Sequence, residues 1–323
     1  MPTPVTLQAP FTLIDKIALP AKPGHGDLVR YDPATGDTYV SLSDGAAVVD
    51  TRTGKVVHTY RSIAAPNGMA FGRHHIYWTD AGGPGKPNRI VVISKRSWKI
   101  VGRISTVGTS PDGIWVDPGM QRLFIAMDDD NWVGIYRTGA VPRFAGKIPL
   151  APAHPKAGPD IGVLVPAKAT LYIPDDATED AISTRTGKLI RAVPLPIPVR
   201  RHGGAKGQIY DTQTNRLWVG TTDHAVLVLN ADTLAVVRRL PAEGSIDQVT
   251  FDPKLGLVYA FEGGAKGFDV YDARTMRRLG VVSTGVGATH TGTVDPITHA
   301  VYAYAGEAAA LYVYRPAAAV LRP

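Results

Sequence analysis

The sequence predicts an all-β protein, a seven-bladed β-propeller with four-stranded blades and an N-terminal strand that closes the last blade. Three observations lead to this prediction. One phrase recurs seven times along the 323 residues, each copy is followed by further short strands, and one strand at the start of the chain belongs to no copy. No helical period of useful length accompanies the copies, so strands alone build the repeat.

Each copy joins two strands through a tight turn. The strands are short and rich in β-branched and aromatic residues, and Gly, Pro, Asp and Asn occupy the turns between them. The copies stand about 40 to 48 residues apart, which is the spacing of propeller blades. In chain order they read "DLVRYDPATGDTYVSLSDG", "NGMAFGRHHIYWTDAGG", "DGIWVDPGMQRLFIAMDDD", "DIGVLVPAKATLYIPDDAT", "KGQIYDTQTNRLWVGTTDH", "DQVTFDPKLGLVYAFEGG" and "HTGTVDPITHAVYAYAGE".

The third and fourth strands follow each copy, as in "AAVVDTRTGK" and "KVVHTYRSI". The seventh copy ends at "ALYVYRP" and supplies only three strands. The spare strand at residues 11–20, "FTLIDKIALP", is similar to the fourth strands of other copies. If it pairs with the last blade, it closes the ring and removes an exposed strand edge. We therefore expect residues 1–323 to form a single seven-bladed domain.

The composition excludes several kinds of structure and binding site. The chain has no Cys, which excludes disulfides and thiolate metal sites. No apolar run is long enough for a transmembrane helix. The first residues, "MPTPVTLQAP", have neither the basic nor the apolar part of a leader. We therefore expect either a cytosolic protein or a periplasmic or secreted protein whose leader has been removed. No motif implies an organic cofactor.

The repeats resemble the YVTN family of bacterial propellers and, within it, the periplasmic YncE-like proteins. The matching residues are "YDPATGDTYVSLSDGAAVVDTRTGKVV" in the first copy and "IDQVTFDPKLGLVYAFEGG" in the sixth. The resemblance covers nearly the whole chain. It implies the propeller fold and export, and because members of the family bind different things, it implies no particular activity.

One polar residue opens the first strand of every copy, and in a propeller these seven positions converge on the central channel. They are Asp27, Asn67, Asp112, Asp160, Lys206, Asp247 and His290. The second strands end in acids on the same face, from Asp44 and Asp80 to Glu262. We therefore expect an acidic mouth, although the net charge is +7. Clustered carboxylates repel one another unless protons, Lys206 or a bound cation offset them. Capping of loop amides is the alternative role for each of these acids.

Carboxylate and amide oxygens suit a divalent cation, Ca²⁺ first and Zn²⁺ or Mn²⁺ next. The stretches "APNGMAFG" and "SPDGIWVDP" resemble the Asn-Gly and Asp-Gly motifs of gluconolactonase and regucalcin-type propellers. That resemblance implies Asn67 and Asp112 as metal ligands, with Asp112 also acting in lactone hydrolysis. The family's Glu ligand has no counterpart here, so Asp27 or Asp160 has to replace it.

Further residues point to ligand binding or catalysis. His25 and His290 are candidate general bases, and they join Asp112 as candidate catalytic residues. The candidates for binding a small polar or anionic ligand are Lys206, Arg201, His202 and Asp247. A salt-bridged loop is the alternative reading of this basic cluster.

Two classes of function stay open. The first is an exported propeller, a monomer, that binds a metal ion, a small ligand or a protein at its mouth. The second is a metal-dependent hydrolase, lactonase or lyase that uses the same residues. Nucleic-acid binding is disfavoured, because the Lys and Arg residues do not form a dense stripe with stacking aromatics.

Overall fold

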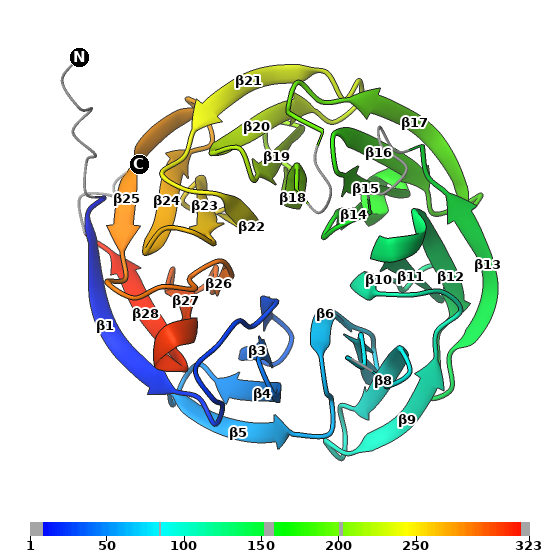
Figure 1. Ribbon diagram of the computed structural model, residues 1–323. Helices are drawn as coiled ribbons and strands as arrows, with labels where there is room; N and C mark the ends of the chain where they lie inside the picture. The colour runs from blue at the N-terminus through cyan, green and yellow to red at the C-terminus, as the bar shows by residue number, and fades with distance from the viewer. Residues whose placement is uncertain (1–8, 84, 152–157, 200–202, 318–323) are drawn as a thin grey trace.

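The computed structural model describes residues 9–83, 85–151, 158–199 and 203–317. Seven four-stranded antiparallel sheets stand in a ring around a central channel (Figure 1). This confirms the predicted seven-bladed β-propeller. The helical parts of the described residues are three short 3-10 turns: η1 (Asp128–Asp130), η2 (Pro166–Lys168) and η3 (Gly306–Ala308). None of these helices could span a membrane.

The first four blades follow the chain, each with its innermost strand first. Blade 1 contains β2 (Val29–Asp32), β3 (Asp37–Leu42), β4 (Gly45–Asp50) and β5 (Lys55–Tyr60). Blade 2 contains β6 (Pro66–Phe71), β7 (His75–Asp80), β8 (Arg89–Ser94) and β9 (Ile100–Ser105). Blade 3 contains β10 (Pro111–Asp117), β11 (Arg122–Met127), β12 (Trp132–Arg137) and β13 (Arg143–Pro149). Blade 4 contains β14 (Val163–Val165), β15 (Thr170–Asp175), β16 (Thr178–Ser183) and β17 (Lys188–Pro194).

The remaining blades keep this order, except that the last one takes its outer strand from the start of the chain. Blade 5 contains β18 (Ala205–Asp211), β19 (Arg216–Thr221), β20 (Ala225–Asn230) and β21 (Val236–Pro241). Blade 6 contains β22 (Ile246–Asp252), β23 (Leu257–Glu262), β24 (Gly267–Asp272) and β25 (Arg277–Ser283). Blade 7 contains β26 (Gly292–Val294), β27 (Val301–Ala305), β28 (Ala310–Pro316) and β1 (Phe11–Ala18).

The closing strand pairs as predicted. β1 runs antiparallel to β28, with Phe11 opposite Pro316 and Ala18 opposite Ala310. The Phe11 ring packs edge-on against Tyr259 and Phe268 of blade 6, at centroid distances of 5.9 and 6.1 Å. β1 therefore joins the two ends of the ring and also contacts the neighbouring blade.

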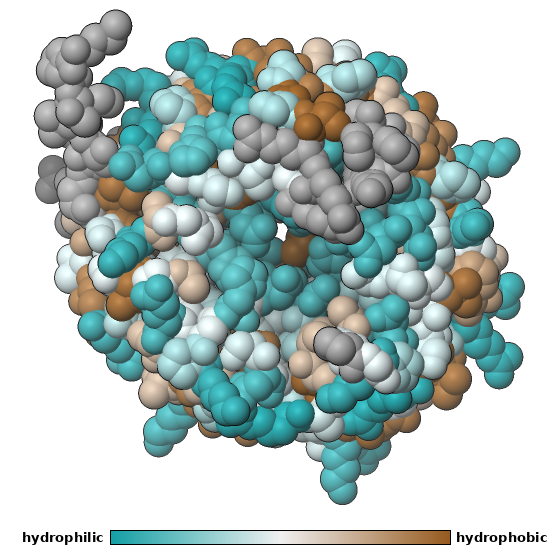
Figure 2. Space-filling view, viewed as in Figure 1, coloured by the Kyte–Doolittle hydropathy of each residue, from teal (hydrophilic) through white to brown (hydrophobic). Residues whose placement is uncertain are grey.

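The core lies between the blades. Seven separate clusters of buried apolar side chains fill the seven gaps between neighbouring sheets. Both faces of the two middle strands are buried in most blades, whereas the outer strands alternate between covered and exposed residues. Burial on both faces explains why the middle strands read as continuous apolar runs such as "AVLVL". The channel that the ring surrounds is visible in Figure 2 as a central opening, with hydrophilic residues around it and an apolar surface at its base.

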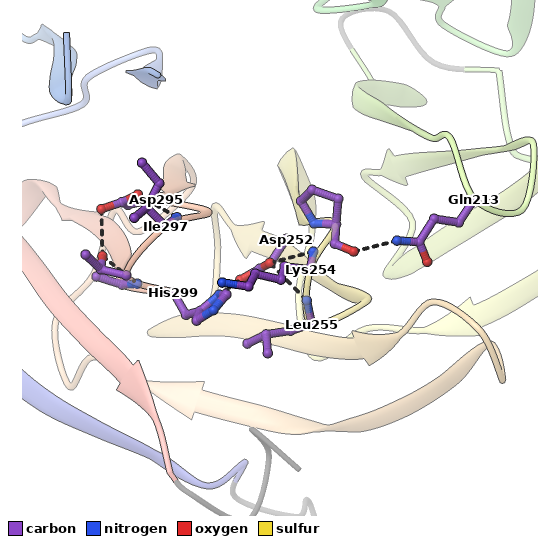
Figure 3. Close-up of polar contacts among 10 residues, drawn as sticks. Gln213, Asp252, Lys254, Leu255, Asp295, Ile297 and His299 are labelled. Atoms are coloured by element: carbon purple, nitrogen blue, oxygen red, sulfur yellow. Dashed lines mark hydrogen bonds and ion pairs between the residues drawn. The ribbon is translucent and has the colours of Figure 1, made fainter. Parts of the chain in front are cut away.

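The turns that join the first and second strands lie on the face of the ring opposite the mouth, and their acidic residues stabilise the turns. Asp252 accepts hydrogen bonds from the backbone N–H groups of Lys254 and Leu255, and Asp295 accepts one from Ile297 (Figure 3). Asp252 also contacts Nδ1 of His299 in blade 7 at 2.6 Å. Both Asp residues are thus turn caps, and Asp252 also links neighbouring blades.

Candidate functional site

The seven residues that the sequence places at the mouth lie at equivalent points of the seven blades. Asn67, Asp112, Lys206 and Asp247 belong to β6, β10, β18 and β22, and Asp27, Asp160 and His290 stand just before β2, β14 and β26. The first strands of neighbouring blades contact one another around the ring. The polar side chains of distant sequence segments are therefore brought around one channel.

A glycine follows several of these residues because the first strands of adjacent blades nearly touch. A Cβ atom on Gly68 would lie 2.6 Å from the backbone oxygen of Asp112 in the next blade. A Cβ atom on Gly207 would lie 2.6 Å from the backbone oxygen of Asp247. Any other residue would force the strands apart. Packing between blades is thus sufficient to explain the glycine in the Asn-Gly motif, whether or not Asn67 binds a metal.

The strongest contact at the mouth is an ion pair. The Nζ atom of Lys206 donates a hydrogen bond to Oδ2 of Asp160 at 2.8 Å, and the two side chains are only 20% and 11% exposed. Asp160, followed by Asp247 and Asp112, raises the pKa of the Lys206 ammonium although burial opposes this. Lys206 therefore stays charged and supplies positive charge at the centre of the acidic residues.

Three other carboxyl groups surround this pair. Burial raises the pKa of Asp27 and of Asp112 well above the usual range, and the charges of neighbouring carboxylates raise it further. Burial, followed by Asp160, raises the pKa of Asp247 to about 7 although Lys206 opposes the shift. The side chain of Asp247 is still 33% exposed, so solvent reaches the site and weakens these effects. Carboxyl groups with such pKa values bind protons near neutral pH and release them when a cation approaches.

Asn67 lies beside this group. Its Nδ2 atom donates a hydrogen bond of 3.3 Å to the backbone oxygen of Pro111, the residue before Asp112. Oδ1 of Asp112 is buried and has no hydrogen-bond partner among the residues that the structure describes. The four residues that the sequence indicates as metal ligands thus lie around one mouth, at equivalent points of their blades. Within the described ranges, however, no three His, Asp or Glu side chains are grouped in a way that could hold a metal ion.

The two histidines predicted at the mouth lie against each other. The rings of His25 and His290 stack at a centroid distance of 3.6 Å, and Nε2 of His290 is 4.0 Å from Oδ2 of Asp247. Burial, followed by the neighbouring His25, lowers the pKa of His290 to about 3, and burial lowers that of His25. Both imidazoles are therefore neutral at pH 7, and His290 is a weak base. Arg201 and His202, the other predicted ligand-binding residues, lie outside the described residues.

Four of the acids at the ends of the second strands have partners of their own. Asp80 accepts hydrogen bonds from the N–H groups of Ala65 and Gly82, and Asp130 accepts one from Thr109. Asp44 pairs with Arg61, and Asp223 pairs with Arg239. These side chains stabilise loops, so the expectation that they add to a common binding surface does not apply to them.

Sequence reasoning missed a buried acidic group in blade 4. Glu179 and Asp180 of β16 are fully buried, and Oε1 of Glu179 accepts a hydrogen bond of 3.0 Å from Nε2 of Gln208. Burial, then the nearby Asp175, raises the pKa of Asp180 to about 8, and burial also raises that of Glu179. A signal was present in "ATEDAIS", because two acids stand where other third strands have apolar residues such as "AAVV".

Comparison with solved structures supports the architecture. The β-propeller domain of Cps50 (Swd1) from Myceliophteria thermophila is similar with a TM-score of 0.77 and 13% identity, over 94% of this chain and 99% of that one. The hydrazine synthase of Kuenenia stuttgartiensis is similar with a TM-score of 0.75 and 17% identity, over 98% of this chain and 99% of that one. At these identities the likeness shows the fold alone. No family model and no curated protein matches the sequence.

Proposed function

We propose that the protein is a binding propeller, without a catalytic step, that takes up a small ligand carrying positive charge at its mouth. A divalent metal ion and an organic ammonium group share this chemistry. One observation carries the proposal: Asp27, Asp112 and Asp247 surround a single ammonium that Asp160 already neutralises. Among the described residues the mouth therefore holds more carboxyl groups than positive charge, and a cation would relieve their repulsion.

The test is a thermal melt at pH 8 with increasing Ca²⁺, Zn²⁺, Mn²⁺ or 1,4-diaminobutane. A ligand that binds only the folded protein raises the melting temperature by mass action. We expect at least one of these cations to raise it, with release of protons from the mouth. We expect Asp112→Asn to abolish the increase, because it removes an unpartnered carboxylate oxygen.

Asp129→Asn is the matched control. Asp129 lies exposed in η1, on a loop of the same face, and the same substitution removes one negative charge there. The proposal is wrong if no cation shifts the melt, or if Asp129→Asn weakens the shift as much as Asp112→Asn does. The metal and diamine arms separate an ion site from an amine site.

Hydrolysis of lactones at the same mouth is a second candidate. It is favoured by the raised pKa of Asp112, because a partly protonated carboxyl group in a channel is a candidate acid or base. A panel of lactones and esters, with and without chelator, tests it. Turnover that is lost in Asp112→Asn but kept in Asp129→Asn would make the protein an enzyme.

Membership of the YVTN group and export rest on the repeat residues quoted above. Fractionation of cells that express the gene from its natural start tests export. A periplasmic or secreted product would support it, and a product confined to the cytosol would contradict it.

A further inference from the structure

A second site lies deeper in the channel than the mouth. A cavity of about 500 Å³ occupies the central channel between the first strands. Its lining includes Pro33, Pro253 and Pro296, which belong to the turns of the face opposite the mouth. The cavity therefore extends toward that opposite face, and a ligand could enter it without crossing the acidic mouth.

The cavity wall differs in charge from the mouth. At the mouth, four of the seven equivalent positions are Asp. Three residues further along each first strand, about 10 Å deeper, the wall contains Arg30, Ala70, Trp115, Val163, Ile209, Thr250 and Thr293. Among the described residues that line the cavity, Arg30 is the one charged side chain.

The Arg30 guanidinium has no carboxylate partner among the described residues. Its Nη1 atom donates a hydrogen bond of 2.5 Å to the backbone oxygen of Met69 in blade 2. Among the described residues no ion pair or second hydrogen bond involves its guanidinium, which leaves Nε and Nη2 free to donate. Burial lowers the pKa of Arg30 to about 10, so the group is still protonated at neutral pH. No acid among the described residues pairs with this charge.

The Arg30 side chain is half-buried at the cavity wall, and an ion of opposite sign would offset its unpaired charge there. A guanidinium with free N–H groups binds carboxylates well, because its planar fork matches two oxygens. The cavity is therefore electrostatically suited to an anion, whereas the mouth is suited to a cation.

Two buried amides give a second, independent indication of a ligand. Gln208 and Gln248 both line the cavity, and each is only 4% exposed. Within the part of the chain that the structure describes, Oε1 of Gln208 and Nε2 of Gln248 have no hydrogen-bond partner. Buried amide atoms are almost always satisfied, so these two indicate a polar group that enters the cavity. The rings of Phe71, Trp115 and Phe251 form apolar parts of the same wall.

We propose that this cavity binds a small organic carboxylate, whose charged group is held by the free N–H groups of Arg30 and whose apolar body packs against Phe71, Trp115 and Phe251. A bare inorganic anion would leave the aromatic wall unused, and a neutral apolar molecule would leave Arg30 without a counter-charge. The site is separate from the mouth and does not depend on the cation proposed to bind there.

Benzoate and hexanoate are the probes, and benzamide is the uncharged match for benzoate. Binding is measured by calorimetry and by the fluorescence of Trp115, with Trp115→Phe to identify that signal. We expect benzoate to bind the full chain and to raise its melting temperature. We expect binding of benzamide to wild type, and of benzoate to Arg30→Gln, to be weaker by at least about tenfold, because each pair loses its charge-assisted hydrogen bonds.

The controls separate this site from general charge effects and from the mouth. Arg274→Gln removes an exposed arginine, and Asp129→Asn removes an exposed acid on the mouth face; both are expected to bind benzoate like wild type. If Arg30→Gln fails to fold, Arg30→Lys keeps the charge but loses the planar fork, and a clear loss of affinity is still expected. The proposal is overturned if neither carboxylate binds at millimolar concentration, if benzamide binds as well as benzoate, or if the Arg30 variants bind like wild type.

Discussion

Lys206 of blade 5 and Asp160 of blade 4 form an ion pair of 2.8 Å at the centre of the ring, with both side chains largely buried. The pair links two neighbouring blades and places one ammonium among four carboxyl groups. An internal cation thus already does part of what a bound metal ion would do. This relationship makes the mouth sensitive to changes in charge.

Removal of the ammonium tests this role. We expect Lys206→Met to lower the free energy of unfolding by about 3 kcal/mol, because loss of one partner leaves a buried carboxylate uncompensated. Chemical denaturation measures the change. Lys168→Met is the control, since the pair of Lys168 with Asp232 is more exposed and should contribute less than about 1 kcal/mol. Equal effects of the two variants would show that Lys206 has no special role.

The closing strand gives a second prediction. Deletion of residues 1–20 removes β1 and exposes the edge of β28, so we expect aggregation or loss of the cooperative melt. Phe11→Ala is a milder change that removes the ring contacts with Tyr259 and Phe268, with an expected loss of about 2 kcal/mol. Thr12→Ala, at an exposed position of the same strand, should have little effect. A deleted chain that melts like the full chain would contradict closure by β1.

Buried carboxyl groups predict the dependence of stability on pH. Burial, then the charge of Asp175, raises the pKa of Asp180 to about 8, and burial, then Asp269, raises that of Glu262 to about 9. In the unfolded chain these groups ionise near pH 4. From there up to pH 8 or 9 the folded protein binds more protons than the unfolded chain, so the free energy of unfolding falls as pH rises.

The measurement is a series of thermal melts between pH 7.5 and pH 9. Burial lowers the pKa values of His25 and His290, so these residues are neutral in the folded protein, and above about pH 7.5 they are largely neutral in the unfolded chain as well and contribute little. We expect the melting temperature to decrease across this range. Asp180→Asn should make the decrease shallower, because an amide does not ionise, and Asp129→Asn should follow wild type. A melting temperature that stays flat or rises would show that these acids are not protonated in the folded protein.

The mouth shows how much of the candidate site could be predicted from the sequence alone. The seven positions were found because each opens a repeat, and neighbouring repeats place equivalent residues side by side. The stacking of His25 on His290 and the pairing of Lys206 with Asp160 were not predictable, since they depend on side-chain directions across blades. Arg30 was missed for a similar reason. In "DLVRYDP" it reads as an ordinary strand residue, and only the closed ring shows that no acid reaches it.

By itself the sequence determined the number of blades, the order of the strands and the strand that closes the ring. These features follow from local signals, because each repeat carries its own turns and its own pattern of apolar residues. Only the tertiary structure decided which polar residues are buried together, paired or left without a partner. Lys206 and Asp160 are 46 residues apart in the chain. Arg30 and Gln248 are even more distant in the chain, and they line the same cavity. Electrostatic interactions fall off with distance and depend on burial, so the charges at these sites are set by the packing of the blades.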